Sequence, residues 1–126
     1  MNPALECVLA ALVLFQIKHF LCDFVFQTLR QVQAKGSYGA MGGVVHAGLH
    51  AVGSLPAILV LTRSPLAIAA VVVVEFVLHY HIDWTKARVD TNKGWTMADQ
   101  KYWIVFGLDQ FVHQLTYAGI IFVLAV

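Results

Sequence analysis

Hydrophobic residues fall into four long runs along this chain, separated by short polar segments. The runs cover approximately residues 3–29, 41–61, 65–86 and 97–126. A helix needs about 20 mostly apolar residues to cross the hydrocarbon layer of a bilayer. We therefore predict four transmembrane helices within a single integral membrane domain over residues 1–126.

The segments between the runs carry signals for helix ends and turns. Asn2 and Ser64 can cap the first and third helices, because each precedes a proline that fits the first helical position. Residues 96–99 match a capping box before the fourth helix. Gly53 and Pro56 predict a kink in the second. Links this short join antiparallel neighbours, so the predicted fold is all-α, an up-down-up-down four-helix transmembrane bundle.

Composition agrees with a membrane location. Of the 126 residues, 60% are hydrophobic and 12% are charged, whereas a soluble domain has about 45–50% apolar and about 25% charged residues. A soluble globule of this size could not bury so much apolar side chain. The net charge of +1 gives no reason to expect a nucleic-acid partner. The bilayer is therefore the expected partner of this surface.

Basic residues predict how the bundle is oriented. Six of them flank the first and third links, whereas only Arg63 lies at the second link. Cytoplasmic loops of membrane proteins carry an excess of lysine and arginine. We therefore predict that the two longer links are cytoplasmic and that both termini lie on the opposite side.

Nine Asp, Glu and His residues inside the apolar runs form groups with a regular spacing, although charged groups oppose insertion there. Successive members within a run are four residues apart, which places them on one helix face. In an antiparallel bundle the four stretches share one level in the cytoplasmic half of the membrane. The nine are His19, Asp23, His46, His50, Glu75, His79, Asp83, Asp109 and His113.

This mixture of histidine and carboxylate predicts a metal site. Lys18 is the only basic residue inside a run rather than at its border, so a single cation stands against four carboxylates. Histidine with carboxylate suits zinc, which we favour, and also iron or manganese. One or two divalent ions could be held, and a metal-free proton or water relay is the alternative. The expected ligands are His19, Asp23, His46, His50, His79, Asp83 and His113.

A carboxylate that does not bind the ion could act as a general base, and Glu75 and Asp109 are the candidates. These features predict a metal-dependent hydrolase that acts on a lipid-like small molecule near the cytoplasmic leaflet. The alternatives are a metal carrier, a metal-binding membrane subunit without catalysis, and a di-iron lipid oxidoreductase. Lys86 fits the membrane border, with anchoring of an anionic substrate as the less favoured interpretation. The sequence is compatible with a homo-oligomer and with a larger membrane complex.

Four motifs together resemble a domain-of-unknown-function family of small bacterial integral membrane proteins. They are HFLCDF at 19–24 with Gln27, HAGLH at 46–50, residues 75–86, and DQFVH at 109–113. The resemblance covers nearly the whole chain and implies a multi-pass protein of the bacterial inner membrane, and hence periplasmic termini. It implies no established activity. The pattern is also loosely similar to membrane-bound metal-dependent hydrolases and to zinc amidases such as ceramidases, an analogy that does not fix function.

Overall fold

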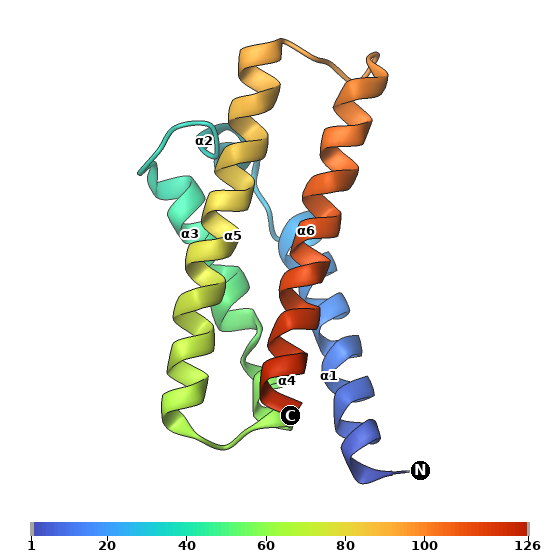
Figure 1. Ribbon diagram of the computed structural model, residues 1–126. Coiled ribbons are helices and arrows are strands. Elements are labelled where there is room, and N and C mark those ends of the chain that lie inside the picture. The colour runs from blue at the N-terminus through green and yellow to red at the C-terminus, as the bar shows by residue number, and fades with distance from the viewer. Residues whose placement is uncertain (1, 126) are drawn as a thin grey trace.

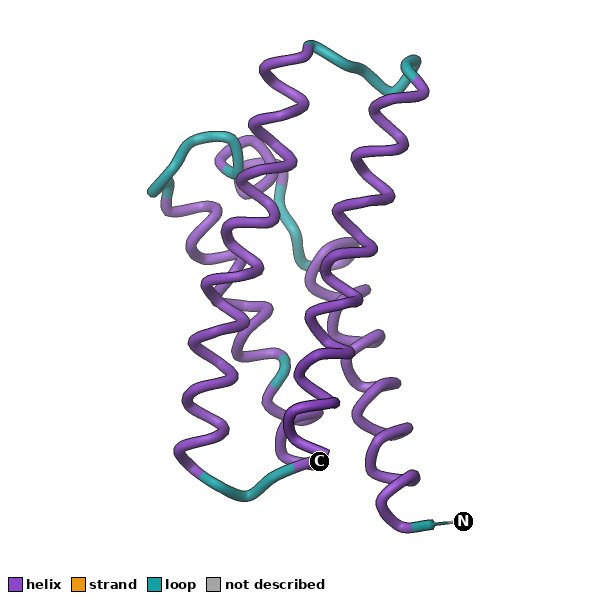
Figure 2. The backbone as a smooth tube through the Cα atoms, in the orientation of Figure 1, coloured by secondary structure: helices purple, strands orange, loops and turns teal. Residues whose placement is uncertain are grey.

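The computed structural model describes residues 2–125, and this range is helical without any strand (Figures 1 and 2). Four stretches are long and apolar enough to cross a membrane, namely Pro3–Val25, Met41–Leu61, Pro65–Lys93 and Gln100–Ala125. The prediction of an all-α protein with four such helices is confirmed. The elements are α1 (Pro3–Phe20), the π-helix η1 (Leu21–Val25), α2 (Leu29–Ala34), α3 (Met41–Gly53), α4 (Leu55–Leu61), α5 (Pro65–Lys93) and α6 (Gln100–Ala125).

The first helical stretch is shorter than the sequence predicts. It ends at Val25 rather than near residue 29, and α2 occupies part of the predicted link. The reason is a capping box, in which Thr28 Oγ1 accepts from the Gln31 N–H at 3.3 Å and Gln31 Oε1 accepts from the Thr28 N–H at 2.7 Å. This reciprocal pair begins a new helix, so the chain turns before it.

The second stretch is divided at Ser54, which ends α3 before α4 begins. Pro56 explains the break, because it has no N–H for the carbonyl of Val52 and its ring clashes with that turn. The Ser54 N–H still donates to the His50 carbonyl at 3.1 Å. The kink predicted from Gly53 and Pro56 is therefore an interruption of the helix.

The last two helices also differ from their predicted bounds. α5 continues to Lys93 rather than residue 86 and ends at Gly94, whose φ of 63° is a left-handed conformation that suits glycine. α6 begins at Gln100 rather than residue 97. The Thr96 N–H donates to Asp99 Oδ2 at 2.8 Å, so residues 96–99 form a turn before the helix.

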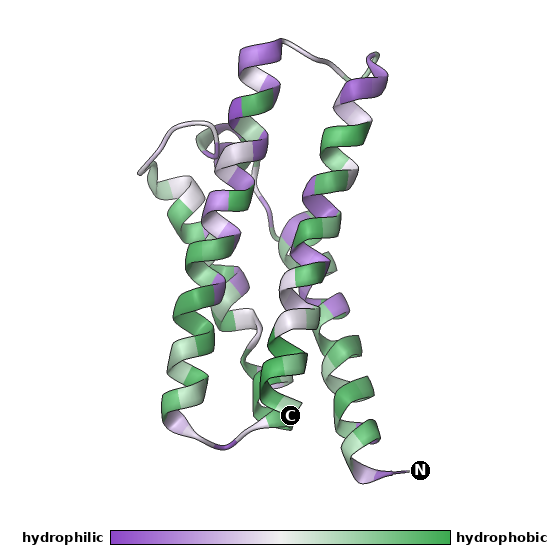
Figure 3. Cartoon of the chain, in the orientation of Figure 1, coloured by the Kyte–Doolittle hydropathy of each residue, from purple (hydrophilic) through white to green (hydrophobic). Residues whose placement is uncertain are grey.

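An apolar core fills the end of the bundle where both marked chain ends lie (Figure 1). Its buried residues are Ala11, Phe15, Ala57, Ile58, Tyr117, Ile120 and Ile121. The rings of Phe15 and Tyr117 stack with centroids 4.9 Å apart, a contact worth about 0.5–1.5 kcal/mol beyond its buried area. Hydrophilic residues gather toward the opposite end (Figure 3). The buried polar residues thus lie above a packed apolar layer.

Large apolar side chains also cover the outside of the bundle. Leu66, Phe122 and Val123 are examples, each at least 69% exposed. Water solvates so continuous an apolar surface poorly, whereas lipid chains solvate it well. The outer surface therefore suits a hydrocarbon environment.

Candidate metal centre

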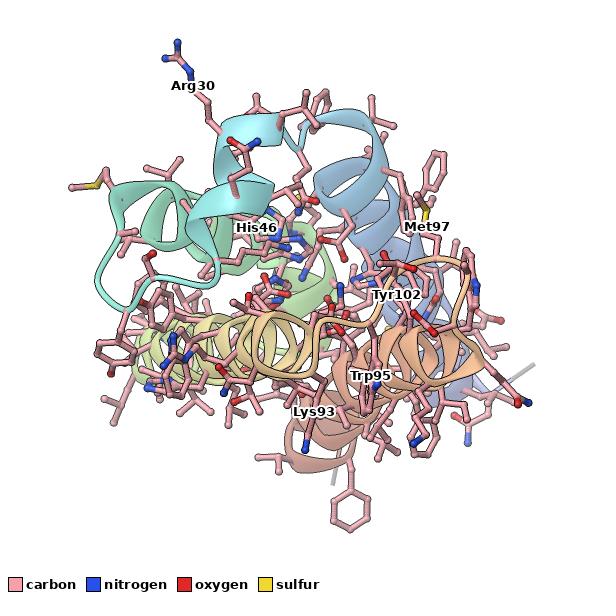
Figure 4. The ribbon with its side chains drawn as sticks, turned by 90° about the horizontal axis from the view of Figure 1, so that it is seen from above. Arg30, His46, Lys93, Trp95, Met97 and Tyr102 are labelled. Atoms are coloured by element: carbon pink, nitrogen blue, oxygen red, sulfur yellow. The ribbon has the colours of Figure 1, made fainter. Side chains whose placement is uncertain are left out.

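Five histidines from four helical stretches meet in the interior of the bundle. His19 comes from α1, His46 and His50 from α3, His79 from α5 and His113 from α6, and all five are buried. The rings of His50 and His79 stack with centroids 3.7 Å apart, and those of His79 and His113 are 4.3 Å apart. Viewed along the bundle, His46 points inward among other nitrogen-bearing side chains (Figure 4). The four-residue spacing therefore orients these histidines toward one another.

The first ligand group consists of Asp23, His46, His50 and His79, whose donor atoms all lie within 4.8 Å of one another. Asp23 Oδ1 is 3.1 Å from His46 Nε2 and 3.2 Å from His50 Nε2. The Nε2 atoms of His46 and His79 are 3.3 Å apart. A tetrahedral ion with bonds of about 2.0–2.1 Å places its ligand atoms about 3.3 Å apart. Three of the six donor separations in this group therefore equal the edge of such a tetrahedron.

The second group shares His79 and adds Asp83 and His113. Asp83 also contacts the first group, because its Oδ2 is 3.3 Å from the Nε2 atoms of both His46 and His79. Its other oxygen is 3.9 Å from His113 Nε2. The carboxylate of Asp83 can therefore contact an ion in either group.

His113 has one ring nitrogen available to bind a metal ion. Its Nδ1–H donates to the Asp109 carbonyl at 2.8 Å, which leaves Nε2 as an acceptor with a free lone pair. That Nε2 is buried and has no hydrogen-bond partner among residues 2–125. Metal-binding histidines commonly hold their second nitrogen in this way, because the hydrogen bond fixes the tautomer and the ring orientation.

His19, expected as a ligand, lies beside the first group rather than in it. Its Nε2 is 2.9 Å from Gln110 Oε1 and 3.3 Å from Asp23 Oδ2, and its Nδ1 is 3.1 Å from the Tyr117 hydroxyl. Both ring nitrogens therefore have partners, and the ring orients Asp23. Gln27 contacts the same group, since its Nε2 is 3.2 Å from His46 Nε2.

Glu75 and Asp109, the two candidate bases, lie in different surroundings. Glu75 is fully buried, and its Oε1 accepts from Lys18 Nζ and from Ser54 Oγ. Lys18 Nζ also donates to the Tyr117 hydroxyl at 3.0 Å and lies 3.4 Å from His50 Nδ1. Glu75 belongs to neither ligand group, so Lys18, Ser54, Glu75 and Tyr117 form a second polar cluster beside them.

Asp109 is also buried, but it borders a cavity. It lines a polar cavity of about 420 Å³ together with Asp23, Asp83, Lys35, Lys86 and Tyr102. Its Oδ1 has no hydrogen-bond partner in the part of the chain that the structure describes. The carboxylates of both ligand groups therefore border one cavity, in which a substrate could approach a bound ion.

Three residues of this region are absent from the expected ligand set although they contact it. Lys35 reaches back from the segment after α2, and its Nζ is 2.9 Å from Asp83 Oδ2. Tyr117 and Ser54 each lie four residues beyond a predicted ligand, His113 and His50. Extending the four-residue spacing by one turn would have found Tyr117 and Ser54. No such pattern points to Lys35.

Comparison with known proteins identifies the family of this chain. A family model described as "Protein of unknown function (DUF3307)" matches residues 11–126. The chain therefore belongs to the DUF3307 family. No curated protein and no solved structure matches it.

Proposed function

We propose that this DUF3307 protein is an intramembrane metal-dependent hydrolase with zinc as the preferred ion. The observation that carries the proposal is the set of separations of 3.1, 3.2 and 3.3 Å among the donor atoms of Asp23, His46, His50 and His79. They equal three of the six edges of a tetrahedral shell around an ion of zinc's size, and the other three are no longer than 4.8 Å. Iron and manganese accept the same donor types, so the identity of the ion is a result of the test below.

The proposed setting is the bacterial inner membrane, crossed four times in up-down-up-down order. Lys35 and Lys86, which line the polar cavity, and Lys93 at the end of α5 support a cytoplasmic position for that end. Both termini would then be periplasmic. The packed apolar core at the other end favours an enzyme over a carrier, because a carrier needs a route to both sides.

The proposed reaction adds one water across an ester or amide bond of a lipid-like substrate. A divalent ion held by the first ligand group would supply a nucleophilic water at neutral pH and polarise the carbonyl or phosphoryl oxygen of the substrate. Asp109 would take a proton from the water while the water oxygen bonds to the acyl or phosphoryl centre. The bond from that centre to the leaving group would then break, and the proton would pass from Asp109 to the leaving group. We assign this role to Asp109 rather than Glu75, because Asp109 lines the cavity whereas Glu75 is paired with Lys18.

Elemental analysis of the detergent-purified protein tests the metal site without knowledge of the substrate. We expect His79→Ala to lose the metal, because His79 is shared by both ligand groups. His81→Ala is the matched control, since His81 is on the same helix and contacts Tyr38 and the Val77 carbonyl instead. A wild-type protein without metal, or equal metal in both variants, would refute the proposal.

The ligands are not expected to contribute equally. When His50 binds an ion through Nε2, the proton on its Nδ1 faces Lys18 Nζ at 3.4 Å, which opposes binding. His113 has no such conflict, because its Nδ1–H already donates to a carbonyl. We therefore expect His50→Ala to retain more metal than His79→Ala in the same analysis.

A metal-free ion-pair network is the second candidate, and one observation favours it. Lys35 Nζ is 2.9 Å from Asp83 Oδ2 and already compensates part of the negative charge. In that case the cluster would relay protons or stabilise the bundle without metal. The same elemental analysis separates the two, because only the hydrolase requires a bound ion.

A further inference from the structure

We infer that the substrate is a lipid with a phosphate-bearing head group whose hydrocarbon chain lies in a groove between α5 and α6. This inference rests on the proposed function and specifies its substrate class. It comes from a second cavity of the structure, which is apolar and adjoins the polar one.

The groove has a volume of about 500 Å³ and an almost entirely apolar lining. Its walls include Leu78, Ile82 and Val89 of α5 and Val105, Leu108 and Val112 of α6. Leu108 is 57% exposed, so the lining is open to the surroundings of the bundle rather than enclosed. In a bilayer this groove would be reached sideways from the hydrocarbon layer.

The groove and the polar cavity share two residues, Lys86 and Asp109. The apolar lining therefore meets a cation and a carboxylate where it adjoins the cavity with the ligand groups. Lys86 Nζ is 3.0 Å from Asp90 Oδ2 and lies 5.4 Å from the ring centre of Tyr102. An amphiphile with its chain in the groove would have its head group at Lys86, facing Asp23 and Asp83.

Charge favours a phosphate as that head group. The polar cavity is lined by Lys35 and Lys86 and by four aspartates, so carboxylates exceed lysines by two. One divalent ion cancels this excess, after which an anion can approach both lysines. Lysine ammonium groups and divalent ions are common phosphate partners in proteins. Binding of the anion should therefore require the metal.

The same two residues argue against a helix of a second copy as the occupant. Packing a helix over the groove would enclose Lys86 and Asp109 in an apolar interface, where desolvation of each charge costs several kcal/mol. A lipid avoids this cost because its polar head covers the charged end while its chain covers the apolar part.

Photo-labelling of the zinc-loaded full chain in non-ionic detergent tests the inference. The probe is phosphatidic acid with a diazirine in its acyl chain, compared with diacylglycerol and oleate that carry the same photoreactive group. We expect phosphatidic acid to label the groove residues about tenfold more than diacylglycerol, the ratio that one charge-assisted contact supplies. Removing the metal, or the change Lys86→Gln, should abolish the preference.

Leu108→Trp should lower labelling by filling the groove. Leu115→Trp is the matched control, because Leu115 lies two turns further along α6, is 52% exposed and does not line the groove. Weaker labelling of Leu108→Trp than of Leu115→Trp supports the lipid site, and equal labelling of the two variants overturns it. Because both positions are exposed, neither variant should disturb the core.

The metal content of each labelled sample separates this inference from the proposed function. Equal labelling by all three lipids with metal present would identify ordinary bilayer lipid in the groove and overturn the inference alone. If the groove residues stay unlabelled and light scattering shows that the protein is a dimer, a second copy occupies the groove. That result would also overturn the inference. Selective labelling in protein without metal would overturn the hydrolase and also the expected metal requirement of the head group, and would support only lipid binding in the groove. Absence of both metal and selectivity would overturn both.

Discussion

The buried pair of Lys18 and Glu75 gives the sharpest prediction about stability. Lys18 Nζ donates to Glu75 Oε1, and the exposed fractions of the two side chains are 5% and 1%. We consider three variants, Lys18→Met, Glu75→Gln and the double variant. Each single change leaves one charged group buried without its partner, whereas the double change removes both charges.

The size of the effect follows from this burial. Removing one member of a buried ion pair costs about 3–5 kcal/mol, because the remaining charge stays desolvated and uncompensated. The Tyr117 hydroxyl and His50 Nδ1 stay near Lys18, and Ser54 stays near Glu75, so each orphaned group keeps at least one hydrogen-bond partner. We therefore expect each single variant to lose about 3 kcal/mol, at the low end of the range. The double variant should lose clearly less than the sum.

Equilibrium unfolding in detergent measures the four free energies and completes a double-mutant cycle. The matched control is the pair Lys86–Asp90, whose side chains are more exposed and whose coupling should be only about 0.5 kcal/mol. A coupling between Lys18 and Glu75 no larger than that of the control would refute the reasoning. Metal content should be unchanged in Glu75→Gln, and its loss would make Glu75 a ligand.

Three further predictions concern the metal and the orientation. A chelator should lower the melting temperature in detergent, because ligands from α3, α5 and η1 share one ion, and an unchanged curve after verified metal removal would contradict this. Asp109→Asn should retain the metal and lose about 10²–10⁴-fold in hydrolysis of a lipid phosphate. Retained activity would exclude Asp109 as the base. A C-terminal reporter that works only in the cytoplasm should be inactive, and an active one would reverse the predicted orientation.

Hydropathy was sufficient to find the four long helices but not their internal breaks. The short helix α2 begins at Leu29, within an apolar run, so average hydropathy continues across the turn before it. The break depends instead on two polar side chains, those of Thr28 and Gln31, that satisfy each other's backbone N–H groups. Because α2 folds back in this way, Lys35 reaches Asp83, a contact between residues that no sequence spacing relates.

The four-residue spacing predicted which helix faces meet, and the structure does bring the five histidines together. Spacing alone could not divide the stripe on α5, because Glu75 and Asp83 are each four residues from His79. The division comes from other elements: Lys18 of α1 pairs with Glu75, whereas His46 of α3 and Lys35 contact Asp83. Partner residues on neighbouring helices therefore decide which carboxylate is available to an ion.

This division also bears on how many ions the site holds. With Glu75 paired to Lys18, the carboxylates left at the two ligand groups and beside them are Asp23, Asp83 and Asp109, and Lys35 compensates one charge. One divalent ion balances the remaining two, whereas a second ion would leave two uncompensated positive charges in a buried site. We therefore expect a metal-to-protein ratio near one. A ratio near two would require Lys35 to leave Asp83, and Lys35→Met should then raise metal occupancy rather than lower it.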